Sequence, residues 1–180
     1  MNPRNGILFS TFGGQGWRKL TDPEPVSGKR AFTQHRVGVD SEVDIEMFPY
    51  WIISLATHAR SLNSDEPVIK LPDLYRLGGA RTLRGYREEQ FLGSRIGWGS
   101  FEVRYWLGQA SRFFLFTDAG GVYREFLEQD RRLSRTIFKT STGLGMRIET
   151  GMGVWGIDYG IGESDNLLRG KLHISLFSTF

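Results

Sequence analysis

Residues 34–47 alternate strictly between two kinds of side chain. Five of the even positions are charged, whereas none of the odd positions carries a formal charge. Successive side chains of a β-strand point to opposite faces, whereas a helix would mix the two sets on both faces. The pattern therefore predicts one long strand with a polar face and an apolar face.

The same alternation recurs along the rest of the chain. Two weaker candidates, residues 7–13 and 112–123, bring the expected number of strands to eight. No segment is a convincing helix. The clear further strands are residues 51–60, 100–107, 139–149, 155–162 and 171–180.

The connections between these strands alternate in length. Residues 48–50, 108–111 and 150–153 are short, and 163–167 is moderate. Outer-membrane barrels have short turns at the periplasmic end and long loops at the outer end. An even number of strands then places both termini of the chain on the periplasmic side. The long connections are residues 14–30, 61–91 and 124–135.

Composition excludes several classes of protein. With 39% hydrophobic and 13% aromatic residues the chain is too apolar for a disordered protein. The absence of cysteine excludes disulfides, thiolate metal sites and a cysteine nucleophile. The net charge of +3 is too small and too scattered to indicate nucleic acid as a partner. No apolar run is long enough for a transmembrane helix, and the first six residues do not resemble a signal peptide.

Period two alone does not decide whether water or lipid meets the apolar face. A soluble lipid-binding barrel places that face inside, and a membrane barrel places it outside. Two observations favour the membrane. Small residues on the polar faces suit a crowded lumen (Gly143, Gly145, Gly156 and Gly160). Aromatic residues on the apolar faces, several near strand ends, suit an interfacial girdle (Trp51, Tyr105, Trp155 and Tyr159).

Several motifs carry a family resemblance. Residues 78–86 read Gly-Gly-Ala-Arg-Thr-Leu-Arg-Gly-Tyr, and residues 116–120 read Phe-Thr-Asp-Ala-Gly. They resemble the (V/L)-R-G-(F/Y) loop and the F-x-D-x-G strand of the BamA-type superfamily of outer-membrane assembly factors and two-partner-secretion translocators, the bacterial surface antigen family. The segments 3–6, 143–154 and 170–180 resemble its mid-barrel, penultimate-hairpin and C-terminal segments in the right order.

The resemblance implies a fold and a function. The fold is all-β, an antiparallel transmembrane β-barrel segment of about eight strands, forming one domain over residues 1–180. The function is insertion of proteins into the bacterial outer membrane, or their secretion across it, without cofactor or bond chemistry. The implied partners are outer-membrane lipids, lipopolysaccharide and unfolded or secreted proteins. Family barrels have sixteen strands preceded by POTRA modules, so the chain matches only the C-terminal half of such a barrel and is either a fragment or a short, solitary or dimeric member.

The loop motif predicts a specific contact. Gly78, Gly79 and Gly85 permit tight turns, and Leu83, Arg84 and Tyr86 complete the motif. A guanidinium suits bidentate pairing with a carboxylate. In the family this arginine meets acidic residues of lumen-facing strands. The matching acids are Glu102 and Asp118, the latter within the strand motif that also contains Phe116 and Gly120.

The last strand resembles the family's C-terminal targeting strand. It begins after Gly170, and its terminal aromatic is Phe180. The resemblance implies that the terminal aromatic is recognised by the host's assembly machinery. The apolar residues expected to face lipid are Leu172, Ile174, Leu176 and Phe180.

Closure of the barrel is constrained by the loop. Eight strands make a barrel whose interior is just filled by side chains, so a loop of some thirty residues cannot also enter it. An inward-folded loop therefore requires a wider wall, from a longer chain or from a second copy.

Other interpretations of the polar faces remain. His58 and His173 suggest a lipid A-modifying outer-membrane enzyme, but no Ser-His-acid spacing repeats a known constellation. A small structural barrel is the other alternative. The carboxylates of residues 40–46 are spread over about 20 Å of strand, which favours a solvated wall over a metal site.

Overall fold

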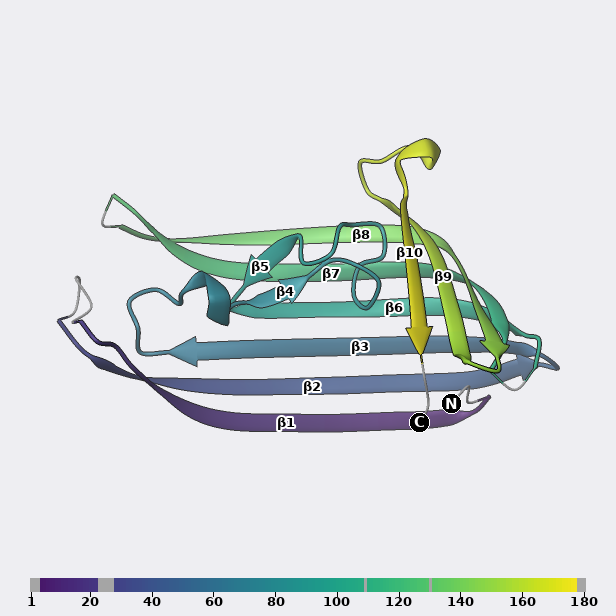
Figure 1. Cartoon of the computed structure of the whole chain (residues 1–180), viewed down its shortest axis with the longest axis horizontal. Coiled ribbons are helices and arrows are strands. Elements are labelled where there is room, and N and C mark those ends of the chain that lie inside the picture. The colour runs from purple at the N-terminus through teal and green to yellow at the C-terminus, as the bar shows by residue number, and fades with distance from the viewer. Residues whose placement is uncertain (1–3, 23–27, 109, 130, 178–180) are drawn as a thin grey trace.

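The computed structural model of the chain describes residues 4–22, 28–108, 110–129 and 131–177. Eight strands form one antiparallel sheet in the order β1-β2-β3-β6-β7-β8-β9-β10 (Figure 1), which confirms the predicted all-β fold and the number of strands. The bounds are β1 Gly6–Lys19, β2 Ala31–Phe48, β3 Trp51–Ser64, β6 Arg95–Trp106, β7 Arg112–Glu128, β8 Arg131–Thr150, β9 Gly153–Gly162 and β10 Lys171–Phe177.

Several strands are longer than the alternation predicted. Residues 124–135 were expected to be a long connection, but β7 and β8 stay paired as far as Glu128 and Arg131. Similarly, β1 continues to Lys19, which shortens the expected connection 14–30. Backbone pairing carries these strands past the apolar band, where the side-chain pattern no longer alternates. The only helical elements in the described part are two three-residue 3-10 turns, η1 Leu71–Asp73 and η2 Leu167–Arg169, so no helix there is long enough to span a membrane.

The register confirms the two-faced character of the sheet. One row of paired residues on the apolar face crosses seven strands and consists of Ile45, Ile53, Val103, Leu115, Leu144, Tyr159 and Leu172. Most of these side chains are exposed in the isolated chain. Charged residues and glycines occupy the opposite face, as in the row Asp44, Ser54, Glu102, Phe116, Gly143 and Gly160. Such a sheet presents its apolar face to lipid and its polar face to a lumen.

The sheet curls but does not close. Pairing begins at β1 and ends at β10, and no ladder joins these two strands within the described residues. Figure 1 shows β9 and β10 turning across the face that carries the long loop. Gly6 of β1 and Phe177 of β10 lie near the short turns, as the even number of strands predicted. The described chain is therefore a curved wall with two edges.

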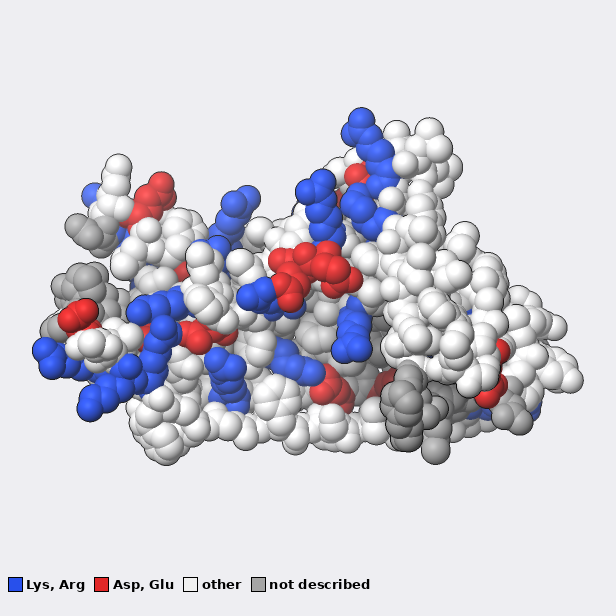
Figure 2. Space-filling view, in the orientation of Figure 1, with Lys and Arg blue, Asp and Glu red and all other residues white. Residues whose placement is uncertain are grey.

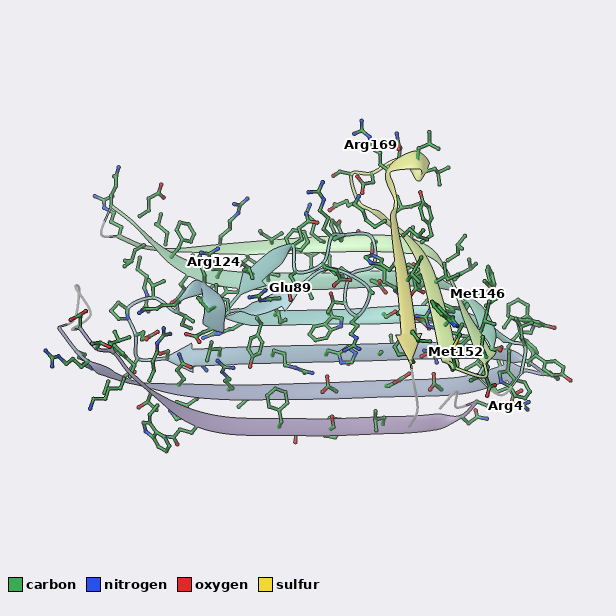
Figure 3. All side chains as sticks on the ribbon, in the orientation of Figure 1. Arg4, Glu89, Arg124, Met146, Met152 and Arg169 are labelled. Atoms are coloured by element: carbon green, nitrogen blue, oxygen red, sulfur yellow. The ribbon has the colours of Figure 1, made fainter. Side chains whose placement is uncertain are left out.

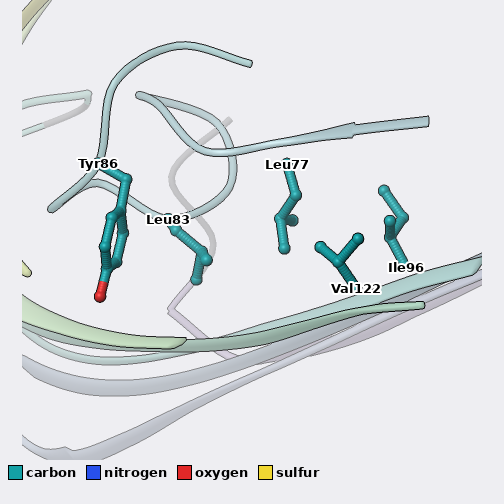
Figure 4. Packing of buried hydrophobic residues seen from close by; sticks show 5 residues of the cluster. All are labelled: Leu77, Leu83, Tyr86, Ile96 and Val122. Carbon is teal, nitrogen blue, oxygen red and sulfur yellow. The ribbon is translucent and has the colours of Figure 1, made fainter. Parts of the chain in front are cut away.

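The long loop contains regular structure that the sequence did not indicate. The turn η1 is followed by a small antiparallel pair, β4 Tyr75–Leu77 and β5 Phe91–Gly93. Beneath it lies the one cluster of buried apolar side chains found in the described part, which joins loop residues to the sheet (Figure 4): Leu77, Leu83, Tyr86, Ile96 and Val122. Burying a leucine contributes about 1.5–3 kcal/mol, so this cluster anchors the loop on β6 and β7.

Candidate functional site

The loop motif begins with a turn that only glycine adopts readily. Gly78 and Gly79 have φ values of 114° and 105°, which side chains with a Cβ rarely tolerate. The Gly79 amide donates to the Leu83 carbonyl at 3.0 Å, and the Gly78 amide donates to the Thr82 hydroxyl at 2.8 Å. This turn directs Arg84 away from the loop and towards the wall.

Arg84 is bound by two carboxylates and a hydroxyl. Its Nε and Nη2 donate to the two oxygens of Asp118 at 2.9 and 2.6 Å. Its Nη1 donates to Oε1 of Glu102 at 2.7 Å, and Nη2 also donates to Ser100 Oγ at 2.6 Å. The main-chain amide of Arg84 donates to Asp118 at 3.1 Å. The structure therefore brings together the three residues that the motif indicated.

This contact is almost completely removed from solvent. Arg84 is 5% exposed and Asp118 0% exposed. The guanidinium carbon of Arg84 lies 3.5 Å from the centre of the Phe116 ring, which adds a cation–π contact from the strand motif. An unpaired charge in such a place would be costly, so each partner depends on the other.

Gly85 is required for space. It lies in a tight turn, as expected, because the Tyr86 amide donates to the Leu83 carbonyl at 3.1 Å, although its φ is not positive. A Cβ at Gly85 would lie 2.5 Å from the Ser141 Cβ and 2.6 Å from the Gly162 amide nitrogen. A Cβ at Gly160 would lie 2.5 Å from the Arg84 carbonyl. The glycines of β9 thus leave the space that the loop backbone occupies.

Two side chains connect the loop to the last three strands of the sheet. The Tyr86 hydroxyl donates to the Thr140 carbonyl at 2.9 Å and accepts from the Glu163 amide at 3.1 Å. His173 of β10 lies with its Nε2 2.8 Å from the Arg84 carbonyl. The loop is therefore bound to β6 and β7 by the side chain of Arg84, and to β8, β9 and β10 by its backbone and by Tyr86.

The polar network extends beyond the predicted residues. Arg104 donates to Glu102 at 2.7 Å and to Asp44 at 2.8 Å, which links β6 to β2. Arg147 and Asp158 form a second bidentate pair at 2.8 and 2.9 Å. Period two places all five side chains on the polar face, but their pairing follows from the register, which the sequence alone did not provide. Asp44 is buried, which corrects the prediction of a solvated wall at this one of the four carboxylates of residues 40–46.

A third charged group lies at the outer end of the lumen, where η1 meets β1. Arg18 is paired with Asp73, and its Nε lies 3.7 Å from Oε1 of Glu66. Burial raises the pKa of the Glu66 carboxyl, and the charge of Arg18 only partly opposes this effect. Within the described residues, no group of three or more metal-ligating side chains is present.

Figure 2 shows the basic and acidic side chains interspersed over the face of the sheet that carries the loop. In Figure 3 Glu89 of the loop lies over this face, and Met152 lies at a short turn at one end of the molecule. A charged lumen wall covered by a loop is thus the main feature of the described chain.

Comparison with known proteins identifies the family. A family model described as the Omp85 superfamily domain matches residues 1–176. The chain belongs to the Omp85 superfamily. This finding confirms the resemblance inferred from the loop and strand motifs. No curated protein matches the chain.

Omp85 proteins are β-barrels of the outer membrane that insert proteins into this membrane or move them across it, and they are generally not enzymes. The two histidines considered as catalytic residues lie in separate polar contacts in this chain. His58 Nδ1 lies 2.6 Å from Asp40 and its ring stacks on Trp98, while His173 contacts Arg84.

The remaining residues of the Omp85-type motifs occupy the following places. Gly120 lies under the loop, where a Cβ would come 3.1 Å from Leu77 Cδ2. Three apolar residues of β10 are exposed on the apolar face: Leu172, Ile174 and Leu176. Gly170 is the last residue before β10, and a Cβ there would meet the Tyr159 ring. Phe180 and Pro3 lie outside the described residues.

Proposed function

We propose that this chain forms part of the wall of an outer-membrane pore that inserts proteins into the membrane or passes them across it, and that Arg84 fixes the loop inside that pore. The observation that supports the proposal best is the buried bidentate pair between Arg84 of the loop and Asp118 of the wall. Held in this way, the loop fills the lumen.

The arrangement of contacts supports a loop that is held as a unit. The apolar cluster anchors Leu77 and Leu83 near β6 and β7. Arg84 then neutralises Asp118 and shares Glu102 with Arg104. Two carboxylates on neighbouring strands would repel each other without a cation between them. The wall is therefore built to receive a loop arginine, and a protein in transit would compete with the loop for the same space.

We further propose that additional strands complete the wall. The unpaired backbone groups of β1 and β10 would each cost several kcal/mol in lipid. An eight-stranded barrel would leave no room for the loop. Strands from a second copy, or from sequence beyond these residues, would satisfy both edges and keep the lumen wide enough for the loop.

The proposed activity can be tested with proteoliposomes and a denatured outer-membrane barrel protein as the probe. We expect wild-type liposomes to accelerate either folding of the probe into the bilayer, seen as a heat-sensitive gel shift, or its protection from external protease. Arg84→Ala should change that rate, because the loop is no longer fixed.

A matched control is Arg76→Ala. Arg76 is also a loop arginine paired with a carboxylate, Glu89, but both side chains are about half exposed, so the change should leave the rate as in the wild type. Rates equal to those of empty liposomes in both readouts would refute the proposed activity. Equal effects of Arg84→Ala and Arg76→Ala would refute the specific role of Arg84.

A further inference from the structure

The apolar face of the sheet contains a hollow near its outer end. Its volume is about 410 Å³, within the range of about 300–1,000 Å³ that is usual for ligand clefts. Its floor is formed by small residues on neighbouring strands, namely Ala59, Gly97 and Gly121. Val37 and Val39 line one side of it.

The hollow exists because the floor residues lack side chains. A Cβ at Gly97 would lie 3.6 Å from its nearest neighbour, and one at Gly121 would lie 3.7 Å from its nearest neighbour. Neither glycine has a positive φ, and neither position is crowded. No packing requirement within the chain therefore explains the two glycines, unlike Gly85, which a Cβ would displace.

The height of the hollow follows from the register. Trp51 and Tyr105 form an edge-to-face pair at 5.1 Å on the apolar face, near the short turns, as an interfacial girdle would. Arg95 lies ten residues from Tyr105 on the same strand and the same face. Ten residues span about 33 Å along a strand, or about 25 Å of height at a tilt of about 40°. The apolar band of a membrane barrel is about 25 Å tall, so Arg95 lies at the outer headgroups and the hollow lies just below them.

Arg95 is held in place and is not neutralised. Its Nη2 donates to Asn63 Oδ1 at 3.2 Å, and its guanidinium lies 5.5 Å from the centre of the Tyr123 ring. Among the described residues no carboxylate pairs with Arg95. The nearby carboxylate of Glu125 accepts from the Tyr123 hydroxyl and pairs with Arg132 at 3.3 Å.

We propose that this hollow binds one acyl chain of an anionic, phosphate-bearing lipid of the outer leaflet, with its phosphate on Arg95. An apolar hollow below a positioned guanidinium matches the two halves of such a lipid, and a guanidinium binds phosphate through parallel hydrogen bonds. The site lies on the outside of the wall and does not involve the loop. Of what membership of the family implies, the proposal uses only the location in the outer membrane. Failure of the insertion assay would therefore leave it standing.

The test is a competition between two lipids for the purified protein. The protein in detergent micelles is incubated with equal amounts of dipalmitoyl phosphatidylglycerol and dipalmitoyl phosphatidylcholine, and the retained lipid is counted by native mass spectrometry. We expect the wild type to retain one phosphatidylglycerol in preference to phosphatidylcholine, because both lipids carry a phosphate but the choline ammonium neutralises that of phosphatidylcholine. Arg95→Gln should reduce this preference by at least about tenfold, the smallest ratio that one hydrogen bond to a charged group supplies, and Arg95→Lys should preserve most of it.

The hollow is tested separately by filling it. Gly121→Leu should reduce retention of both lipids, whereas Gly13→Leu, on the same face of β1, where a Cβ meets nothing within 4 Å, should not. A heat-sensitive gel shift verifies that each variant is folded. The proposal is overturned if the wild type shows no preference, if Arg95→Gln retains it, or if Gly13→Leu and Gly121→Leu behave alike.

Discussion

Replacing Arg84 by alanine should release the loop while the sheet stays folded. The change removes four side-chain hydrogen bonds, to Asp118, Glu102 and Ser100. Removing one partner of a buried ion pair costs about 3–5 kcal/mol. We take the lower end, about 3 kcal/mol, because Arg104 still neutralises Glu102 and the amide of residue 84 can still donate to Asp118.

Limited proteolysis measures this loss directly. When opening is fast relative to cleavage, the rate of cleavage follows the population of the open form. A cost of about 3 kcal/mol raises that population roughly a hundredfold. Trypsin should therefore cut the loop about a hundredfold faster in the variant, at the sites that remain: Lys70, Arg76, Arg81 and Arg87.

Two further variants distinguish a direct contact from general loosening. The double variant Arg84→Asp with Asp118→Arg should regain part of the protection, because the pair is restored with reversed polarity. Arg76→Ala should leave cleavage at the other sites unchanged, since its pair with Glu89 is exposed and exposed pairs contribute about 0–1 kcal/mol. Unchanged cleavage in Arg84→Ala would refute the idea that this arginine holds the loop.

Three other changes probe separate parts of the same attachment. Gly85→Ala should increase tryptic cleavage at least as much as Arg84→Ala, because its Cβ would clash with Ser141 and β9. His173→Ala should increase hydrogen exchange in β10, because it removes the contact with the Arg84 carbonyl. Burial raises the pKa of Glu66 above its ordinary 4.5. The Glu66 carboxyl therefore binds a proton more readily in the folded loop than in the released loop. The attachment of the loop should therefore weaken as the pH rises above about 4.5. Glu66→Gln should remove the contribution of this residue to the pH dependence of loop attachment, measured as the ratio of tryptic cleavage rates at pH 5 and pH 7.

A specific result would contradict each of these three predictions. Gly13→Ala is the control for Gly85→Ala and should be neutral, so equal effects would show that the clash is not the cause. If His173→Ala leaves hydrogen exchange in β10 unaltered, His173 does not contribute to the attachment of the loop. A cleavage ratio that Glu66→Gln leaves unchanged would assign the pH dependence to other groups.

The sequence predicted the strands because their side chains carry the signal themselves. Alternation along each strand depends only on which face meets lipid, and the row of paired residues from Ile45 to Leu172 confirms it. The predicted ends of β7 and β8 were wrong because backbone pairing continues where the side chains no longer need to alternate. The pair β4 and β5 was missed because three-residue strands are too short to show a period.

The candidate site was predictable only where a motif supplied a long-range contact. Arg84, Glu102 and Asp118 came from the family resemblance and from period two, and no local pattern pairs residues so far apart. Arg104 with Asp44 was missed because it requires the register of β2, β3 and β6. The space requirement at Gly85 was missed because the sequence shows that a side chain is absent but not which atoms occupy the space.

The loop spans the concave side of an open sheet, attached on one side to β6 and β7 and on the other to β8, β9 and β10. A sheet with free edges has no fixed radius of curvature, since hydrogen bonds between neighbouring strands permit a range of angles. The contacts of Arg84, Tyr86 and His173 fix the distance across the arc. Releasing the loop would therefore allow the arc to flatten, and the width of the lumen would change together with the separation of the two edges.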